Sequence, residues 1–284
     1  MLESFAPSER QSWALLILPG TLLAEYLWLR SRGNHTYDWR ESLVSVVIAA
    51  GDRVIRAGTA LLILPLYQLV YAHRLLDLTI DGPAAFAALI VAVDFAYYWT
   101  HRAMHGVRWM WATHAVHHSS KALNLSAAYR LGWTDLVSGT WAFLLPFVWL
   151  GVPPLAVLGA FALNLGYQFF LHTEAVGRLG PLEAVLNTPN HHRVHHAHND
   201  GCVDRNFGGI LIVWDRWFGT FAQAPSVGSL RYGLLGSPRC LNPIAVVFGE
   251  WHRLTTELRQ ACNLWQALRI AFSIRTLNDD PRRS

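Results

Sequence analysis

Cysteine is scarce in this chain, with three residues among 284, at Cys202, Cys240 and Cys262. An odd number without CxxC spacing indicates neither a disulfide framework nor a cysteine-type zinc site, and it fits a reducing compartment. Charge is scarce too, because 15% of the residues are charged against 52% hydrophobic ones, and the mean hydropathy is +0.23. This balance lies on the apolar side of soluble domains and indicates that a membrane is the solvent.

Several motifs are also missing. The formal charge of +4 comes from scattered arginines without a Lys/Arg block, which argues against a nucleic acid partner. There is no internal repeat and no low-complexity linker. The chain has no G-x-G-x-x-G fingerprint, no cysteine-rich ferredoxin motif and no haem-binding segment, so electrons for any redox reaction must come from outside. The absence of HExxH weighs against a zinc-dependent membrane hydrolase.

Long apolar runs predict membrane-spanning helices. The first run contains Glu25 and lacks the features of a signal peptide, so we expect it to be retained. The second run extends from residue 42 and is interrupted by Asp52, Arg53 and Arg56, which leaves its second half to cross the lipid and makes residues 42–50 an interfacial helix or an extension of the span. The predicted spans are residues 13–29, 57–71 and 83–105, and a hairpin with short arms at 136–150 and 155–171.

These spans imply an orientation. If the second and third runs form a hairpin, five arginines lie on the side where the third run ends, and the positive-inside rule makes that side cytosolic. The loops HRLLDLTIDGP and GVPP then face the other side, and the N-terminus lies outside. The arginines are Arg30, Arg32, Arg40, Arg53 and Arg56. We therefore expect a multi-pass protein, in a bacterial inner membrane, with its histidine-rich segments in the cytosol.

The fold class predicted from these runs is all-α. It is an integral membrane bundle of about four transmembrane helices with a cytosolic, histidine-rich helical cap. We expect N-terminal membrane helices in residues 1–82, the catalytic part in residues 83–222, and C-terminal amphipathic or interfacial helices in residues 223–284, where 244–274 carries Trp251 and Trp265.

Histidines form three clusters at helical spacing, and a ninth stands alone. Residues three or four apart share one face of a helix, so each cluster presents its imidazoles together. The first cluster lies at the end of the third apolar run, and the third lies in HHRVHHAHND. The candidate ligands are His101 and His105, then His114, His117 and His118, then His172 alone, then His192, His195 and His196.

Nine imidazoles exceed the needs of one zinc ion, which takes four ligands, so two metal ions are the natural count. Imidazole suits iron, zinc, copper and nickel. Because the clusters follow apolar helices, a lipid chain could approach the metals, and an iron pair that activates O2 for attack on a C–H bond explains both features. The alternative is a membrane metal-binding or metal-transport protein. His191 and His198 are spare candidates beside the third cluster.

Three further polar residues are candidate hydrogen-bonding partners of the ligating imidazoles, which usually donate their other N–H to a carboxylate or carbonyl. Asp94 and Tyr98 precede His101 on the same helical face, and an acid within an apolar run indicates a functional site. Asp204 follows the third cluster. No catalytic residue beyond the metal ligands is predicted.

The text around these histidines resembles the fatty acid hydroxylase and sterol desaturase superfamily of integral membrane di-iron oxygenases. The resemblance rests on DFAYYWTHRAMH, WATHAVHHSSKALNLSAAYR, NLGYQFFLHTEAVGRLGPLEAVLNTPNHHRVHHAHND and DRNFGGILIVWDRWFGTF. Within the superfamily, the FLHTE, LGPLE and LNTPNHHRVHH segments are most similar to the alkylglycerol monooxygenase branch and its bacterial relatives. Val176 stands where the fatty acid 2-hydroxylase branch has another histidine.

The resemblance implies two non-haem iron ions held by the nine histidines, O2 as co-substrate, and cytosolic histidine boxes that cap four transmembrane helices. It implies hydroxylation or desaturation of a lipid C–H bond in an ether lipid, a sterol or an acyl lipid. The expected partners are that lipid, the bilayer and an external electron donor, which a pterin, a ferredoxin or a cytochrome b5-like protein would supply.

Overall fold

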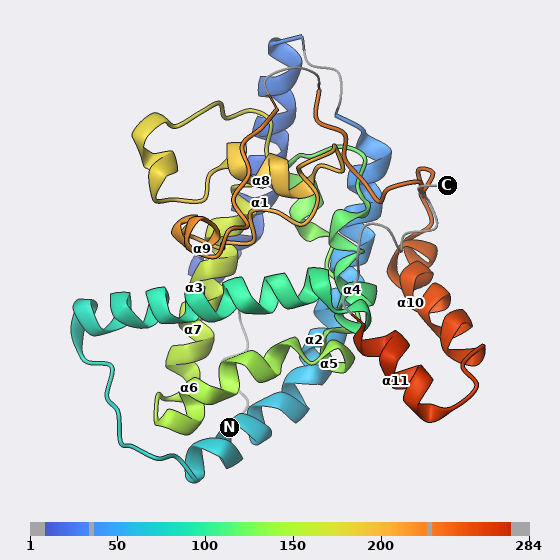
Figure 1. The fold of residues 1–284 in the computed structure, drawn as a ribbon. Coiled ribbons are helices and arrows are strands. Elements are labelled where there is room, and N and C mark those ends of the chain that lie inside the picture. The colour runs from blue at the N-terminus through green and yellow to red at the C-terminus, as the bar shows by residue number, and fades with distance from the viewer. Residues whose placement is uncertain (1–8, 34–36, 226–228, 274–284) are drawn as a thin grey trace.

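The computed structural model describes residues 9–33, 37–225 and 229–273, and side chains from residue 20 onward, and Figure 1 shows their arrangement. The described part is all-helical, with two isolated β-bridges and no strand. This confirms the predicted helical class. The longer helices are α1 (Glu9–Ser31), α2 (Trp39–Ala72), α3 (Gly82–Gly106), α7 (Pro154–Phe169), α10 (Pro243–Arg259) and α11 (Leu264–Phe272). The shorter elements are α4 (Arg108–His114), η1 (His117–Ser119), η2 (Leu125–Tyr129), α5 (Asp135–Ser138), η3 (Thr140–Leu144), α6 (Leu145–Leu150), η4 (Gly180–Ala184), α8 (Pro189–His196) and α9 (Val213–Trp217).

Helix α2 runs without a break through the charges that interrupt the second apolar run, so residues 42–50 continue directly into the helix that follows. The Asp38 carboxylate caps its start by accepting from the backbone N–H groups of the first turn. Asp52 is buried and pairs with Arg56 one turn later at 2.8 Å, and Arg56 also bonds Asp135 of α5. Because these charges are neutralised by partners within the fold, the helix continues across them.

One helix among the described residues, α3, is long and apolar enough to cross a membrane. It begins at the Asp81-Gly82-Pro83 turn, where proline at the first turn needs no N–H partner. α7 has 16 residues, fewer than the roughly 20 that a straight crossing needs. The side chains of residues 13–19, in the first predicted span, lie outside the described part. The structure therefore supports one of the expected crossings, and the bundle of about four stays a prediction.

The first arm of the predicted hairpin differs from expectation, because residues 136–150 do not form one helix. Gly139 adopts a left-handed conformation with φ of 80°, which separates α5 from η3. Pro146 then lies in the first turn of α6, where its missing N–H costs no intrahelical bond. The arm is thus built from three short elements.

The two loops predicted to share a membrane side touch each other. Leu75 donates its backbone N–H to the Trp149 carbonyl at 2.8 Å. Gly151 lies so close to Leu76 that a Cβ atom at position 151 would be 2.0 Å from the Leu76 carbonyl oxygen. A glycine is required here, also because φ is 119°. The turns after α2 and α6 therefore lie at the same end of the fold.

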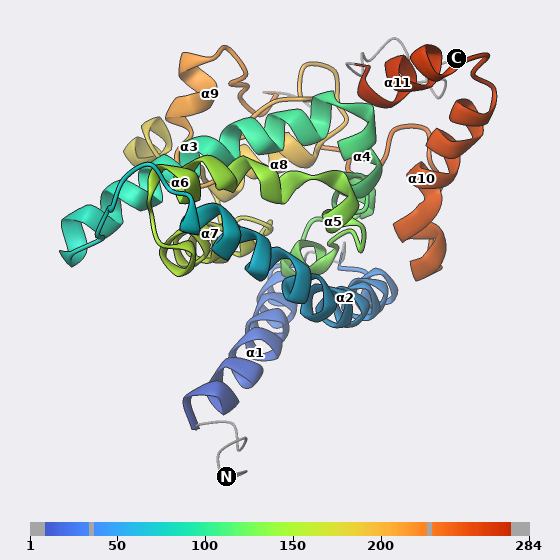
Figure 2. The same cartoon turned by 90° about the horizontal axis from the view of Figure 1, so that it is seen from below.

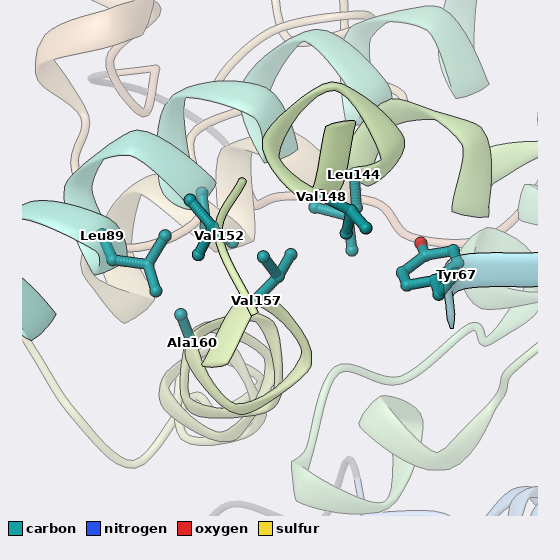
Figure 3. Close-up of a cluster of buried hydrophobic side chains, with 8 residues drawn as sticks. Tyr67, Leu89, Leu144, Val148, Val152, Val157 and Ala160 are labelled. Atoms are coloured by element: carbon teal, nitrogen blue, oxygen red, sulfur yellow. The ribbon is translucent and has the colours of Figure 1, made fainter. Parts of the chain in front are cut away.

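A hydrophobic core packs α2, α3, α6 and α7 together beside these turns. Figure 3 shows side chains from these elements directed toward one another. Its buried members are Tyr67, Leu89, Leu144, Val148, Val152, Val157 and Ala160, together with Val93. This core fixes the directions in which α3 and α7 leave it, and both helices lead into histidine-bearing segments.

The C-terminal helices cover α4, as Figure 2 shows. The helices expected in the C-terminal part are α10, which ends at Arg259, and α11, which begins at Leu264. Trp251 of α10 donates its indole N–H to Thr134 at 2.8 Å, and its ring meets Trp109 edge-on. The outer face of α11 leaves Trp265 exposed. The division of the chain into three domains stays a prediction.

Candidate metal centre

The structure gathers all nine predicted histidines into two groups, which we name the five-histidine group and the four-histidine group. Within each group the atoms able to bind a metal lie within 4.8 Å of one another. Eight of the side chains are buried and His117 is partly buried. The first group is His101, His105, His114, His118 and His195, and the second is His117, His172, His192 and His196.

Each group combines segments that are distant in sequence. His195 of α8, which carries the third cluster, and His101 of α3, which carries the first, have ring centroids 4.5 Å apart. The second and third clusters are each divided between the groups: His118 and His195 face one, while His117 and His192 face the other. Neighbouring histidines of one cluster therefore belong to different groups, because adjacent positions on a helical turn point to different sides of the helix.

The Nε2 atoms converge within both groups. In the five-histidine group, His114 Nε2 is 3.1 Å from His101 Nε2 and 3.2 Å from His118 Nε2. In the four-histidine group the Nε2 atoms are separated by 3.0 Å for His117–His172, 2.9 Å for His172–His192 and 3.0 Å for His192–His196. Nitrogens that would bind one metal ion at about 2.1 Å each lie roughly 3.0 to 3.4 Å apart, and the observed spacing is close to this range.

The pairing of His117 with His172 tests whether these residues fit a metal. His172 Nδ1 lies 2.8 Å from the Gln168 carbonyl, and His117 Nδ1 lies 3.3 Å from the Arg130 carbonyl. A carbonyl only accepts, so Nδ1 carries the proton in each ring and Nε2 of a neutral imidazole presents a lone pair. Two lone pairs 3.0 Å apart repel each other unless a cation lies between them, so the pair fits a bound metal ion.

Burial keeps the described imidazoles neutral. Desolvation lowers the pKa of His117 and of His195 to about 3, and that of His172 to about 4. At neutral pH these rings therefore carry no charge and keep their lone pairs. His195 Nε2 is buried without a hydrogen-bond partner, as expected of a nitrogen that serves a metal ion.

Three members of the five-histidine group bond to one short segment, which we name the acceptor strip (residues 204–207). The bonds join His105 Nδ1 to the Asp204 carboxylate at 3.0 Å, His195 Nδ1 to the Arg205 carbonyl at 2.8 Å and His101 Nδ1 to the Phe207 carbonyl at 2.9 Å. Asp204 and Asn206 have left-handed φ of 55° and 57°, which Asp and Asn tolerate better than most residues. The strip fixes three rings through their Nδ1 atoms.

The four-histidine group is held by carbonyls from other elements. Gln168 at the end of α7 supplies one, and Arg130 just after η2 supplies the other. Arg130 is itself fully buried, and its guanidinium bonds the Glu41 carboxylate and Ser45 of α2. The two groups are thus oriented by different parts of the chain.

Asp94 does not bond an imidazole, which corrects the expected direct contact. Its buried carboxylate accepts from the backbone N–H groups of Ile210 (2.7 Å) and Leu211 (3.1 Å) and from the Trp214 indole (2.8 Å). It also accepts from the Asn164 side chain at 2.5 Å. These four donors occupy both oxygens of the carboxylate. Asp94 can therefore influence the histidines only indirectly, through the backbone turn and the Asn164 side chain that it bonds.

Of the other two predicted partners of the imidazoles, Asp204 bonds a histidine and Tyr98 does not. The Tyr98 hydroxyl lies 3.0 Å from Thr220 Oγ1 and accepts from Arg102 at 3.1 Å, and neither bond reaches a histidine. Asp204 is where the sequence places it, within hydrogen-bond distance of His105. Tyr98 is therefore also one step removed from the imidazoles.

The two spare histidines belong to neither group. The His191 ring packs on Phe221, and His198 Nδ1 lies 3.0 Å from the Gly233 carbonyl. His73 and His252 are exposed, and His35 lies outside the described residues. The structure gives no tenth imidazole to the two groups from the part of the chain that it describes.

Comparisons with known proteins agree with this geometry. Residues 86–220, which contain all nine histidines, match the model of the fatty acid hydroxylase family. The chain belongs to the fatty acid hydroxylase family. No solved structure matches it.

Three relatives illustrate the range of similarity. Human alkylglycerol monooxygenase is 44% identical over 176 residues, covering 62% of this chain and 39% of the relative. Alkylglycerol monooxygenase of Caenorhabditis elegans is 32% identical, covering 85% of this chain and 47% of the relative. The ornithine lipid hydroxylase of Rhizobium tropici is 30% identical, covering 54% and 47%.

The matched segments span less than half of the length of these curated relatives. The alkylglycerol monooxygenases among them come from vertebrates and a nematode, so the expected bacterial membrane gains no support.

Proposed function

We propose that this protein is a membrane-bound, non-haem di-iron monooxygenase that hydroxylates a lipid C–H bond with O2. One observation carries the proposal: nine imidazoles in two adjoining groups, with buried Nε2 atoms about 3 Å apart, in a chain of the fatty acid hydroxylase family. The five-histidine and four-histidine groups would each hold one iron ion. Imidazole suits iron as well as zinc, copper and nickel, and iron is chosen here because an iron pair would activate O2 for attack on a C–H bond.

The reaction must balance. A C–H bond and O2, with two electrons and two protons, give a C–OH group and water, and the bound iron pair supplies the activation of O2. The electrons come from outside, because the chain has no redox motif of its own; a pterin, a ferredoxin and a cytochrome b5-like protein are the candidate donors.

The residues of this chain hold and shield the reacting centre. The acceptor strip and the carbonyls of Gln168 and Arg130 keep the proton on Nδ1, so that Nε2 stays available as a ligand. Burial keeps these rings neutral and excludes water from around them. The tautomer and the dry surroundings are therefore properties of the fold itself.

We take an ether lipid of the alkylglycerol class as the substrate. The support is the 44% identity with human alkylglycerol monooxygenase, against 30% with the ornithine lipid hydroxylase. Sterols and acyl lipids are the competing substrates to include in the test. We further propose that the histidines lie on the cytosolic side, because the last turn of the candidate span α3 carries His105 and the arginine distribution assigns that end to the cytosol.

A metal transporter is the rival function. Such proteins place their ligands in broken helices near the middle of the membrane. Here α3 is unbroken, and His101 and His105 occupy its last two turns while most other members come from α4, η1 and α8 beyond it. This placement favours an enzyme over a transport path.

The decisive experiment is metal analysis of anaerobically purified protein followed by a turnover assay. We expect close to two iron ions per chain and 18O from labelled O2 in the product of an alkylglycerol, at a higher rate than with ornithine lipid or sterol. Zinc as the main metal, or iron without label in any lipid, would contradict the proposal. Label in a sterol or acyl lipid alone would keep the oxygenase and reject the substrate.

A further inference from the structure

The acceptor strip is anchored by a carboxylate that sequence analysis does not single out. Asp215 of α9 is fully buried, and its two oxygens accept from the backbone N–H groups of Phe207 and Gly208, both at 2.7 Å. Thr220 donates to the same carboxylate at 2.6 Å. The Phe207 peptide is therefore gripped by Asp215 just before the carbonyl that accepts from His101.

Gly208 shows how closely this carboxylate approaches. A Cβ atom at position 208 would lie 2.4 Å from the Leu211 carbonyl oxygen and 3.0 Å from Asp215 Oδ2. Only glycine leaves room for the backbone to fold onto the carboxylate here. The first glycine of the FGG sequence is thus required by the close approach of Asp215 and the Leu211 carbonyl.

Asp94 accepts hydrogen bonds from the next residues of the same turn, but it also contacts a different helix. It holds the N–H groups of Ile210 and Leu211, and it also accepts from Asn164 of α7. Asn164 in turn accepts from the Gln168 side chain at 2.5 Å, and the Gln168 carbonyl faces His172 of the four-histidine group. Asp94 therefore connects to both groups.

The bonds of Asp215 lead directly to the five-histidine group through Phe207. Their path to the four-histidine group is longer, because it runs from the Gly208 carbonyl, which accepts from Asn187, into the start of α8. The carbonyls that orient the four-histidine group belong to Gln168 and Arg130, which lie on other elements. Asp94 and Asp215 can be compared directly, because both carboxylates are buried and both accept from backbone N–H groups of one turn. They differ in their further contacts, since only Asp94 also bonds Asn164 of α7.

We propose that Asp215 is a positioning residue that sets the five-histidine group selectively, through the Phe207 carbonyl and the rest of the acceptor strip. This rests on the two-metal centre of the proposed function. In Asp215→Asn, the amide keeps one acceptor oxygen but turns its NH2 donor toward one of the two N–H groups that the carboxylate accepts from. The strip then shifts, and the imidazoles that it orients lose their alignment.

The test is metal stoichiometry of the full-length protein, titrated with Fe2+ under anaerobic conditions and challenged with a chelator. For Asp215→Asn we expect one of two ions to bind about 10 to 100 times more weakly, the range typical of lost support for a ligating imidazole. The matched control Asp94→Asn should weaken both ions. Equal weakening of both ions in Asp215→Asn, or unchanged binding, would overturn the proposal.

Ligand variants identify which ion is affected. Combined with His192→Ala, which removes a member of the four-histidine group, Asp215→Asn should leave almost no tightly bound iron. Combined with His118→Ala, from the five-histidine group, it should add little further loss, because both changes act on one ion. The reverse pattern would show that Asp215 acts on the four-histidine group and would overturn the proposal.

A milder variant covers the case in which Asp215→Asn does not fold. Thr220→Val removes the hydroxyl that donates to Asp215 while keeping the carboxylate, so it should weaken the same single ion to a smaller extent. Loss of both ions in Thr220→Val would reject selectivity. Wild-type protein that binds only one ion would instead contradict the proposed function, and the two failures are therefore distinguishable.

Discussion

The rings of His118 and His196 stack with centroids 4.4 Å apart and planes 24° apart, although the two residues belong to different histidine groups. His118 also packs against His195 at 4.7 Å, within its own group. The two groups are therefore in direct contact, because His118 packs against a member of each. Because rings of the two groups pack against each other, controls outside both groups are essential.

Replacing His118 or His195 by Ala should abolish lipid oxidation and lower the bound iron while leaving membrane insertion intact. Each change removes a ligand, whereas insertion depends on apolar helices elsewhere. Iron content, product formation and the membrane fraction are measured on the same preparations. The exposed His252 provides the control, since His252→Ala should keep both iron and activity. Loss of iron in that control would bring α10 into the site.

His172 distinguishes a ligand from an incidental buried histidine. We expect His172→Ala to weaken iron binding as strongly as His192→Ala, because their Nε2 atoms lie 2.9 Å apart in one group. His191→Ala is the matched control: His191 is buried next to His192 but belongs to neither group. Iron titration of the three variants decides the matter, and equal loss in His191→Ala would mean that burial alone explains the effect.

The sequence could predict which histidines meet, but not how they divide. Helical spacing identified eight of them, and the family resemblance added His172. The split of His117 from His118 depends on how η1 is turned against α8, which no spacing reveals. The acceptors were largely missed because most are backbone carbonyls, such as those of Gln168 and Phe207, and a carbonyl belongs to every residue. Asp204 was predictable because its acceptor is a side chain.

The fold was predictable to a similar depth. Composition and apolar runs indicated helices, and the uninterrupted α3 confirms the third run. The sequence left open how residues 42–50 continue into the second span, because Arg56 pairs with Asp135, a partner 79 residues away, and local charge patterns cannot reveal such a contact. The prediction of one helix for the first hairpin arm was wrong, because Gly139 adopts a left-handed conformation that the neighbouring sequence does not predict.

Asp94→Asn should leave the protein folded but reduce both turnover and iron affinity, by about 10 to 100 times, which is milder than loss of a ligand. Asn keeps one acceptor oxygen for the N–H groups of Ile210 or Leu211 but loses the other. Steady-state rates with saturating iron, set beside iron titrations, separate weaker binding from a misplaced centre. A silent Asp94→Asn would show that the turn is held well enough by Asp215 alone.

Glu41→Gln should destabilise the protein by about 3 to 5 kcal/mol, because it leaves the buried Arg130 guanidinium without its counter-charge. The two side chains are 3.2 Å apart, and both are almost inaccessible to solvent. Denaturant titration in detergent micelles measures the loss. Arg74, whose ion pair with Asp77 is exposed, gives the control: Asp77→Asn should cost less than about 1 kcal/mol. Similar losses in both variants would show that burial of the Glu41 pair is unimportant.

Membrane sidedness can be tested by cysteine labelling in intact cells. The loop after α2 is predicted to lie outside, and the Asp77 side chain is 84% exposed, so Asp77→Cys should react with an impermeant maleimide. Thr255→Cys on the exposed face of α10, beside the histidine-bearing end, should react only after the cells are opened. Both changes are made after Cys240 and Cys262 are replaced by Ser, since the structure leaves these thiols at least partly accessible. Labelling of Thr255→Cys from outside would reverse the orientation inferred from the arginines, and labelling of neither position before opening would place the loop after α2 on the inside.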